Sequence, residues 1–244
     1  MSTYKTSGIA IKSTRLGEAD KIITFLTTEG KLSAVAKGVR RPSSKFGGRL
    51  EPGNDLDLVF AKGRNIDTVA QVQIKTVRPW LRGDLDRLEA AYIMMETADK
   101  MTTEKAHDDR LLGLLAAGLD RLKDEARPPL LLAAFDIKTL AMTGFLPYLS
   151  ACVVCGANNK LHRLGLPEGG LVCDDCYQEG PAVGLGAEEK ELIKKLLTVR
   201  LTDLDGVKAD SSLVEKVRKI IWSHMAYHVR ADFKARPEKG QYDA

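Results

Sequence analysis

The four cysteines of this chain form two Cys-x-x-Cys pairs. Cys152 and Cys155 make the first pair, Cys173 and Cys176 make the second, and seventeen residues separate the pairs. This spacing is typical of a tetrahedral zinc site, in which four thiolates leave no open position for water or substrate. We therefore expect one zinc ion that stabilises the fold and does no chemistry. Two redox-active dithiols, or disulfides in an exported protein, would explain each pair but not their separation, and His162 between the pairs is a spare candidate ligand.

A run of basic residues between positions 31 and 49 is the second candidate site. It contains no acidic side chain, and its middle is too rich in Gly, Pro and Ser to form a regular element. A cationic loop on a folded scaffold can follow a phosphate backbone, and two further cations flank the first predicted turn. A solvated connection would show the same pattern, so the charges alone leave both interpretations open. The predicted DNA-binding residues are Arg15, Lys21, Lys31, Lys37, Arg40, Arg41, Lys45 and Arg49.

The positive charge of the chain is concentrated in its N-terminal third. The 244 residues carry a formal net charge of +4, but residues 1–80 hold fourteen Lys and Arg against seven Asp and Glu. The remainder holds twenty-three basic against twenty-six acidic side chains. A polyanion would therefore be steered to the N-terminal third.

Aromatic side chains are sparse in that third, which bears on how a nucleic acid would be held. Tyr4, Phe25, Phe46 and Phe60 are the only ones in the first 79 residues, and Phe25 and Phe60 fall in apolar runs that favour core packing. A protein that stacks bases on aromatic rings sequesters them, whereas one that holds mainly phosphates leaves the base edges free to pair. The sequence thus predicts sequence-independent binding that permits strand annealing.

The first eighty residues show the pattern of short strands. Apolar and polar residues alternate over residues 55–58 and 70–75, as in half-buried antiparallel strands. Three further apolar runs bring the number of predicted strands to five, which favours a small closed barrel of the oligonucleotide-binding (OB) type. These three runs cover residues 9–12, 22–27 and 32–37.

Beyond Pro79 the apolar period becomes that of helices. Asp84 is placed to cap the first helix, and a third helix, almost uniformly apolar and ending at Gly144, is expected at the centre of a bundle. Ser212 and Glu215 form a predicted capping box for the last helix. The predicted helices cover residues 85–95, 111–122, 128–142, 192–197 and 212–221.

The predicted fold class is α+β. An N-terminal five-stranded OB-fold-like β-barrel would occupy residues 1–80. An α-helical domain, built from residues 81–150 and 181–244, would follow and carry a four-cysteine zinc knuckle at residues 151–180.

The sequence lacks the motifs of common enzyme classes. It contains no Gly-x-x-x-x-Gly-Lys-Ser/Thr loop, no His-Glu-x-x-His pattern and no His-x-Glu partner of a zinc deaminase. His224 and His228 are four residues apart on the last predicted helix. They adjoin its apolar stripe without a carboxylate partner, which favours core histidines over a metal site. We expect no enzyme.

Composition also indicates a compartment. No stretch is apolar enough to span a membrane, and the first residues lack the apolar segment of a signal peptide. Paired thiols fit a reducing environment, so we expect a cytoplasmic protein without a membrane partner.

Four segments together resemble the RecO family of bacterial recombination mediators. They are RLGEADK at residues 15–21, AKGVRR at residues 36–41, GGRLEP at residues 47–52, and GFLPYL at residues 144–149, which leads into the first cysteine pair. The segments occur in the family's order, and the resemblance covers about residues 8–180.

The resemblance implies a DNA repair protein that binds single- and double-stranded DNA and anneals complementary strands. With RecR it would promote the loading of RecA on DNA coated by single-strand-binding protein, whose C-terminal tail it would contact, and RecF is a further candidate partner. Such a protein would associate with the nucleoid during repair. Lys31 and Lys45 are predicted DNA contacts on charge alone. The residues that match the family's basic motifs are Arg15, Lys21, Lys37, Arg40, Arg41 and Arg49.

Two other classes of protein remain open. One is a zinc-stabilised protein–protein adaptor, whose basic loop meets an acidic partner protein and does not bind DNA directly. The other is a zinc hydrolase acting on nucleic acid, which would need an open coordination position.

Overall fold

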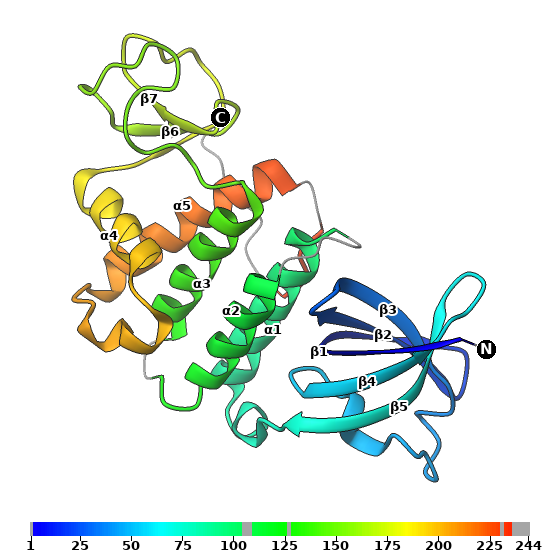
Figure 1. The fold of residues 1–244 in the computed structure, drawn as a ribbon. Coiled ribbons are helices and arrows are strands. Elements are labelled where there is room, and N and C mark those ends of the chain that lie inside the picture. The colour runs from blue at the N-terminus through cyan, green and yellow to red at the C-terminus, as the bar shows by residue number, and fades with distance from the viewer. Residues whose placement is uncertain (1, 104–108, 126–127, 230–231, 236–244) are drawn as a thin grey trace. The chain divides into compact units, whose positions relative to one another are not determined.

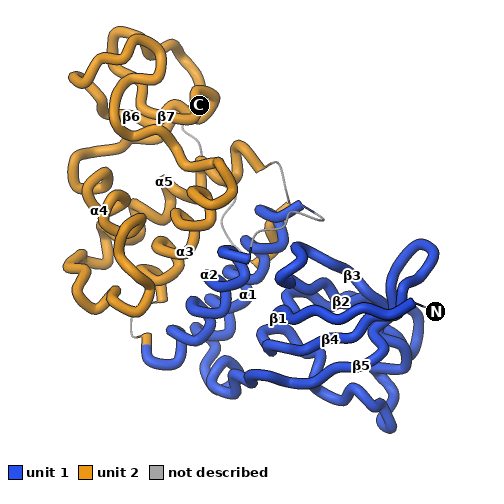
Figure 2. Tube along the Cα trace, viewed as in Figure 1, with its two compact units in different colours: residues 1–124 blue, residues 125–244 orange. Residues whose placement is uncertain are grey.

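The computed structural model describes residues 2–103, 109–125, 128–229 and 232–235 of the chain (Figure 1). The chain divides into two compact units, residues 1–124 and residues 125–244 (Figure 2). None of the described helices is long and apolar enough to cross a membrane.

Five strands of the first unit close into a barrel, in the order β1-β2-β3-β5-β4. Neighbouring strands are antiparallel except β3 and β5, which are parallel. The predicted OB-fold-like barrel is confirmed. Its strands are β1 (Thr3–Leu16), β2 (Asp20–Thr27), β3 (Gly30–Ala36), β4 (Asp55–Ala61) and β5 (Asp67–Thr76), and the short 3-10 helix η1 (Gly47–Leu50) precedes β4.

The barrel interior is filled by apolar side chains from all five strands. Phe25 and Phe60 are fully buried and meet edge to face, with ring centroids 5.6 Å apart. Phe46, which precedes η1, enters the same core. Burial of each ring contributes about 2–3 kcal/mol to folding. The expectation that Phe25 and Phe60 pack in the core is confirmed.

Strand β1 is long enough to pair with two neighbours. It pairs with β4 through its first half and with β2 through its second half, and a register shift between Ala10 and Lys12 bends it. Where the two pairings overlap, a side chain on Gly8 would collide with the carbonyl of Leu26. Only glycine permits this close approach of the strands.

Two helices of the first unit cover one side of the barrel. Helix α1 (Leu85–Met101) follows the 3-10 helix η2 (Pro79–Arg82), and both α1 and α2 (Asp109–Arg121) contact β1. As predicted, Asp84 caps α1, accepting a hydrogen bond from the amide of Arg87 at 3.0 Å. The barrel strands end before η2. The domain boundaries predicted at residues 80, 150 and 180 stay predictions.

The burial of the strands shows which barrel face the helices cover. Residues 9–11 of β1 and residues 23–27 of β2 are buried without interruption, so both faces of these strands are covered there. In β4 and β5, by contrast, alternate side chains reach solvent. The outer face of β4, β5 and the first half of β1 therefore stays open.

The second unit is a helical bundle with a small sheet. Helix α3 (Pro128–Thr143) contacts both α4 (Ala187–Thr198) and α5 (Ser211–Val229), and the 3-10 helix η3 (Leu201–Gly206) precedes α5. Helix α3 is buried continuously over residues 130–137, as expected of a central helix. A three-stranded sheet, ordered β7-β6-β8, follows α3 in the chain. Its strands are β6 (Arg163–Gly165), β7 (Gly170–Val172) and β8 (Ala182–Gly184).

The last helix starts differently from the prediction, and the expected capping box of Ser212 and Glu215 is wrong. The carboxylate of Asp210 accepts a hydrogen bond from the amide of Leu213 at 2.8 Å. Glu215 instead contacts Arg218 at 3.0 Å. Asp210 combines a capping oxygen with a negative charge at the helix N-terminus, which the helix dipole favours.

Candidate nucleic-acid interface and candidate metal centre

Five of the predicted cations gather around the turn between β1 and β2. Arg15 and Lys21 are direct partners across the β1–β2 ladder, so their side chains lie on the same side of the ribbon. The other three belong to the loop that follows β3. We call this group the turn cluster; it consists of Arg15, Lys21, Lys37, Arg40 and Arg41.

Hydrogen bonds fix the loop after β3 to this turn. The amide of Gly38 donates to Asp20 Oδ1 at 2.7 Å, and the amide of Arg40 donates to the carbonyl of Ala19 at 3.0 Å. The Arg40 guanidinium also donates to the carbonyl of Gly17 at 3.1 Å. Residues distant in sequence are thereby held at one end of the barrel.

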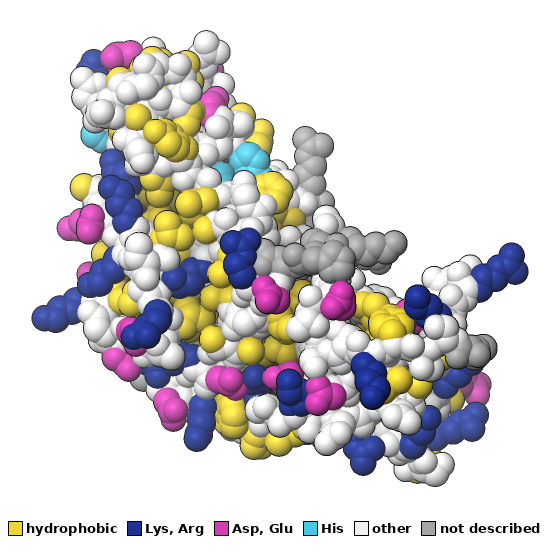
Figure 3. Space-filling view, in the orientation of Figure 1, with side chains coloured by type: hydrophobic (Ala, Val, Ile, Leu, Met, Phe, Trp, Pro, Cys, Tyr) yellow, Lys and Arg dark blue, Asp and Glu magenta, His cyan; other side chains and the backbone are white. Residues whose placement is uncertain are grey.

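Most of the turn cluster is free to meet an anion. Arg15, Lys37, Arg40 and Arg41 are exposed, and none forms an ion pair with a residue that the structure describes. Lys21 lies 3.8 Å from Glu51, in a pair that is partly exposed on both sides. Figure 3 shows basic side chains protruding along the outer rim of the barrel, at the lower right of the view.

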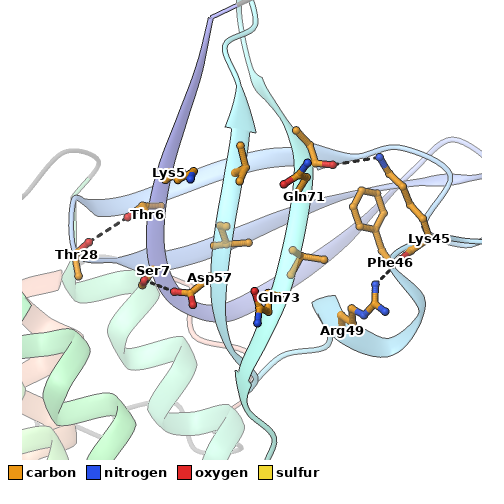
Figure 4. A pocket seen from close by; sticks show the side chains of 14 residues that line it. Lys5, Thr6, Ser7, Thr28, Lys45, Phe46, Arg49, Asp57, Gln71 and Gln73 are labelled. Carbon is orange, nitrogen blue, oxygen red and sulfur yellow. Dashed lines mark hydrogen bonds between the residues drawn. The ribbon is translucent and has the colours of Figure 1, made fainter.

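Lys45 and Arg49 lie instead beside a groove on the open face of the barrel (Figure 4). The groove has a volume of about 950 Å³ and is lined by β1, β4, β5 and the segment that leads into η1. Lys45 Nζ donates to the carbonyl of Ala70 at 3.2 Å and lies 5.0 Å from the centre of the Phe46 ring. Arg49 donates to the carbonyl of Lys45 at 2.8 Å, which orders this edge of the groove.

The structure places Lys31 apart from both groups. Its ammonium donates to the carbonyl of Asp99 on α1 at 2.6 Å and lies 3.2 Å from the Asp99 carboxylate. Lys12 approaches the same carboxylate at 3.3 Å. The Lys31 side chain is only 19% exposed, so its charge is engaged in fastening α1 to the barrel.

Three groove residues were missed by the sequence analysis. Lys5 on β1 and both Gln71 and Gln73 on β5 line the groove beside Lys45 and Arg49. The alternation of β5 indicated that its glutamines face outward. No sequence signal showed that this outward face is hollowed.

The aromatic rings of the described barrel are occupied by packing. Phe25, Phe46 and Phe60 are at most 2% exposed. Tyr4 is half-buried against Phe60, and its hydroxyl donates to Asp67 at 2.5 Å. Burial and the Asp67 carboxylate raise the pKa of Tyr4 above its usual value. The barrel surface therefore offers cations rather than exposed rings to a nucleic acid.

The four cysteines come together in the second unit, with their sulfur atoms within 4.8 Å of one another. The Sγ atoms of Cys155 and Cys173 are 3.7 Å apart. A metal bound tetrahedrally at about 2.3 Å from each sulfur would separate the sulfurs by about 3.8 Å. The four residues Cys152, Cys155, Cys173 and Cys176 could therefore hold one metal ion, and the cluster is consistent with a zinc site.

Tight turns and thiol electrostatics favour a cation at this cluster. The Cys173 amide donates to the sulfur of Cys152 at 3.4 Å, and amides of Cys173 and Cys155 lower the pKa of Cys152 to about 6. Hydrogen bonds with the sulfurs of Cys155 and Cys173 raise the pKa of Cys176 to about 12. Four thiolates this close repel one another unless a cation lies between them, so the donor set fits a metal ion. Gly156, with φ of +75°, makes the turn after the first pair.

Of the two histidines, His224 lies in the interior of the second unit and His228 is half-buried. His224 is buried, and its Nε2 lies 2.8 Å from the carbonyl of Phe145. The rings of His224 and His228 are 4.5 Å apart, and burial lowers the pKa of His224 to about 4. The prediction of a core histidine is confirmed for His224. His162 is exposed and lies outside the cysteine cluster.

Comparison with known proteins extends these observations to the whole chain. The family model "Recombination protein O N terminal" matches residues 1–78, and "Recombination protein O C terminal" matches residues 82–237. The chain belongs to the RecO family. The two matches together span the barrel, the helices and the cysteine cluster, so the resemblance expected from four short segments is confirmed.

Similar proteins of the RecO family occur in several bacteria. A protein of Frankia casuarinae is 37% identical, with 97% of this chain and 98% of that protein covered. A protein of a Nocardioides species is 34% identical over 95% and 97%, and one of Alkaliphilus metalliredigens is 30% identical over 95% and 96%. Each is named DNA repair protein RecO. The chain is thus a DNA repair protein of this family.

Proposed function

We propose that this RecO-family protein is a recombination mediator that binds single- and double-stranded DNA without sequence specificity. The observation that carries the proposal is the turn cluster, where Arg15, Lys37, Arg40 and Arg41 are exposed without carboxylate partners among the described residues. Side chains of this kind bind phosphates by Coulomb attraction and release counterions. Phosphate contacts carry no sequence information, which accounts for the lack of specificity.

The same surface supports strand annealing. Because its aromatic rings are packed inward, the barrel would hold a strand by its phosphates and leave the base edges exposed to a complementary strand. Annealing of this kind brings two strands together and breaks no covalent bond, so the proposed function requires no catalytic residue.

The partners of the protein are proposed from its family. With RecR it would promote RecA loading on DNA coated by single-strand-binding protein, contacting the C-terminal tail of that protein. RecF is a further candidate partner. This work would take place in the cytoplasm, at the nucleoid during repair.

We also propose that the metal is zinc. The donor set consists of four sulfurs, the sulfur spacing suits a tetrahedral ion, and zinc prefers this set in structural sites. When bound, zinc would supply four bonds that hold the two Cys-x-x-Cys turns together. The residues that would hold it are Cys152, Cys155, Cys173 and Cys176.

Charge reversal at the turn cluster tests the proposal. Each phosphate contact contributes roughly fivefold to single-strand affinity at about 0.1 M salt, since the salt slope is about −0.7 per contact. Arg40→Glu with Arg41→Glu should therefore weaken DNA binding at least about 25-fold. The matched control reverses Lys194 and Lys195, which are exposed on α4 in the second unit.

Fluorescence anisotropy with a labelled oligonucleotide measures the affinity, and thermal unfolding shows that both variants fold. The mediator function is supported if the Lys194/Lys195 control binds DNA like wild type and the Arg40/Arg41 variant binds it more weakly. Equal affinity of the three proteins would favour an adaptor whose basic loop meets an acidic partner protein.

A further inference from the structure

We propose that the groove over β1, β4 and β5 is the track for a nucleic-acid strand, in place of the β2–β3 face that OB folds commonly use. This inference rests on the proposed function, because it names the surface on which the strand lies. It adds Lys5, Gln71 and Gln73 to the contact residues.

The common OB-fold face is occupied by the protein itself. Leu26 on the outer side of β2 is 1% exposed, and Thr24 bonds Ser33 of β3 across this face at 3.1 Å. Asp99 of α1 pairs with Lys31 of β3 and with Lys12 of the neighbouring strand β1. Because its outer apolar side chain Leu26 is buried and Lys31 is paired with Asp99, this face presents little free positive charge to a polyanion.

The groove on the opposite side keeps its charges unpaired. Lys5, Lys45 and Arg49 stand along it (Figure 4), and none has an ion pair among the residues that the structure describes. Lys45 and Arg49 are positioned by backbone carbonyls, which hold the side chains without neutralising them. A groove that is lined by unpaired cations and has a volume of about 950 Å³ suits a phosphate backbone.

The floor of the groove is polar rather than acidic. Gln71 and Gln73 are exposed on β5 and point into it (Figure 4). Asp57 is the one carboxylate among the lining residues, and it accepts a hydrogen bond from Ser7 at 2.6 Å while Lys75 lies 3.9 Å away. Amide side chains both donate and accept, so they can bind phosphate oxygens, sugars and base edges alike.

A nucleic acid fits this groove better than an acidic peptide does. β4 is paired with β1 and β5 in the closed barrel, so its edge is not open for a peptide strand to join. Phe46, the aromatic side chain in the lining, is 2% exposed and cannot anchor a hydrophobic peptide residue. Cations beside polar amides, with no hydrophobic pocket, match a sugar-phosphate chain.

The groove is also continuous with the turn cluster along the chain. Arg41 of the turn cluster and Lys45 of the groove edge are four residues apart, and the amide of Ser44 donates to the Arg41 carbonyl at 2.9 Å. This compact turn takes the chain from the cluster to the groove. One strand lying in the groove can therefore extend onto the turn cluster.

Two groove variants test the inference by anisotropy with a labelled oligothymidylate of about 16 nucleotides, the upper end of one OB-fold site. Lys5→Ala should weaken binding about fivefold at 0.1 M salt and make the salt slope shallower by about 0.7. Gln71→Glu with Gln73→Glu places two negative charges on the floor and should weaken binding about tenfold or more.

Each variant has a control with the same change of charge in the second unit. Lys208→Ala controls for Lys5→Ala, and Asn158→Asp with Asn159→Asp controls for the glutamine pair, all at exposed positions. The controls should bind like wild type, and thermal unfolding should show every variant folded.

The outcomes separate the inference from the proposed function. One outcome is that the groove variants bind the oligonucleotide like their controls while Arg40→Glu/Arg41→Glu binds it more weakly. In that case the strand does not lie in the groove, and the proposed mediator function is still supported. If the wild-type protein binds no oligonucleotide, both are wrong. If the groove variants lose affinity for polyglutamate but not for the oligonucleotide, the groove serves an acidic protein partner and the inference is overturned.

Discussion

The contacts of Asp99 predict how firmly helix α1 is fixed to the barrel. Its carboxylate is 11% exposed and faces Lys31 at 3.2 Å and Lys12 at 3.3 Å. Removing one partner of a fully buried ion pair costs about 3–5 kcal/mol. Here Lys12 is half-exposed and can turn to water, and Lys31 keeps the carbonyl of Asp99. We therefore expect Asp99→Asn, which preserves the volume, to lower the free energy of unfolding by about 2 kcal/mol.

A double-mutant cycle isolates the contact. Lys31→Met alone should also destabilise the protein, and its coupling energy with Asp99→Asn should be about 1–2 kcal/mol in urea unfolding. Lys75→Met is the control, because the Lys75–Asp57 pair is exposed on both sides and contributes at most about 0.5 kcal/mol. An additive cycle would refute this account. So would a Lys31→Met protein of wild-type stability that binds DNA fivefold more weakly, since Lys31 would then be a phosphate contact.

Two further predictions concern the second unit. Cys176→Ser should lower the metal content from about one zinc per chain and destabilise the unit by about 3 kcal/mol, which is a quarter of a typical zinc-binding free energy. Elemental analysis measures the metal content, and thermal unfolding measures the stability. Full stability without metal would contradict the proposed zinc site. His224 has its pKa lowered from 6.5 to about 4, so its neutral form stabilises the fold above pH 6.5 and that stability is lost as the pH falls toward 4. Wild type should therefore lose about 2.5 kcal/mol more than His224→Gln between pH 7 and about pH 4.5, measured by urea unfolding, and equal losses would be inconsistent with a buried neutral histidine.

The sequence predicts the elements of this fold well because their signals are local. Strand alternation, the Asp84 cap and the proline and glycine that bound α3 each act within a few residues. Gly144 ends α3 with φ of +80°, and the amide of Phe145 donates to the carbonyl of Leu140 at 2.8 Å, as helix-terminating geometry requires. The spacing of the cysteines also indicates that they come together, because two Cys-x-x-Cys pairs about 15–20 residues apart are typical of one zinc site.

The sequence predicts less well which cations are exposed and which are paired within the protein. Lys31 and Arg40 belong to the same basic run, yet one is held by a carboxylate 68 residues away and the other is exposed. That difference depends on α1 packing against β1, a long-range contact without a local signal. The groove beside Gln71 and Gln73 likewise depends on the segment that leads into η1 packing beside β5, where Lys45 contacts Ala70, 25 residues away, and this contact has no local signal.

The central claim is that cations of the barrel hold the phosphates of a nucleic acid, and its most direct test is the salt dependence of binding. The affinity of the wild-type protein for a single-stranded oligonucleotide, measured between low and moderate salt, should fall with a log–log slope of about −3.5 if five phosphates are neutralised. An affinity that is unchanged across this range would contradict the claim.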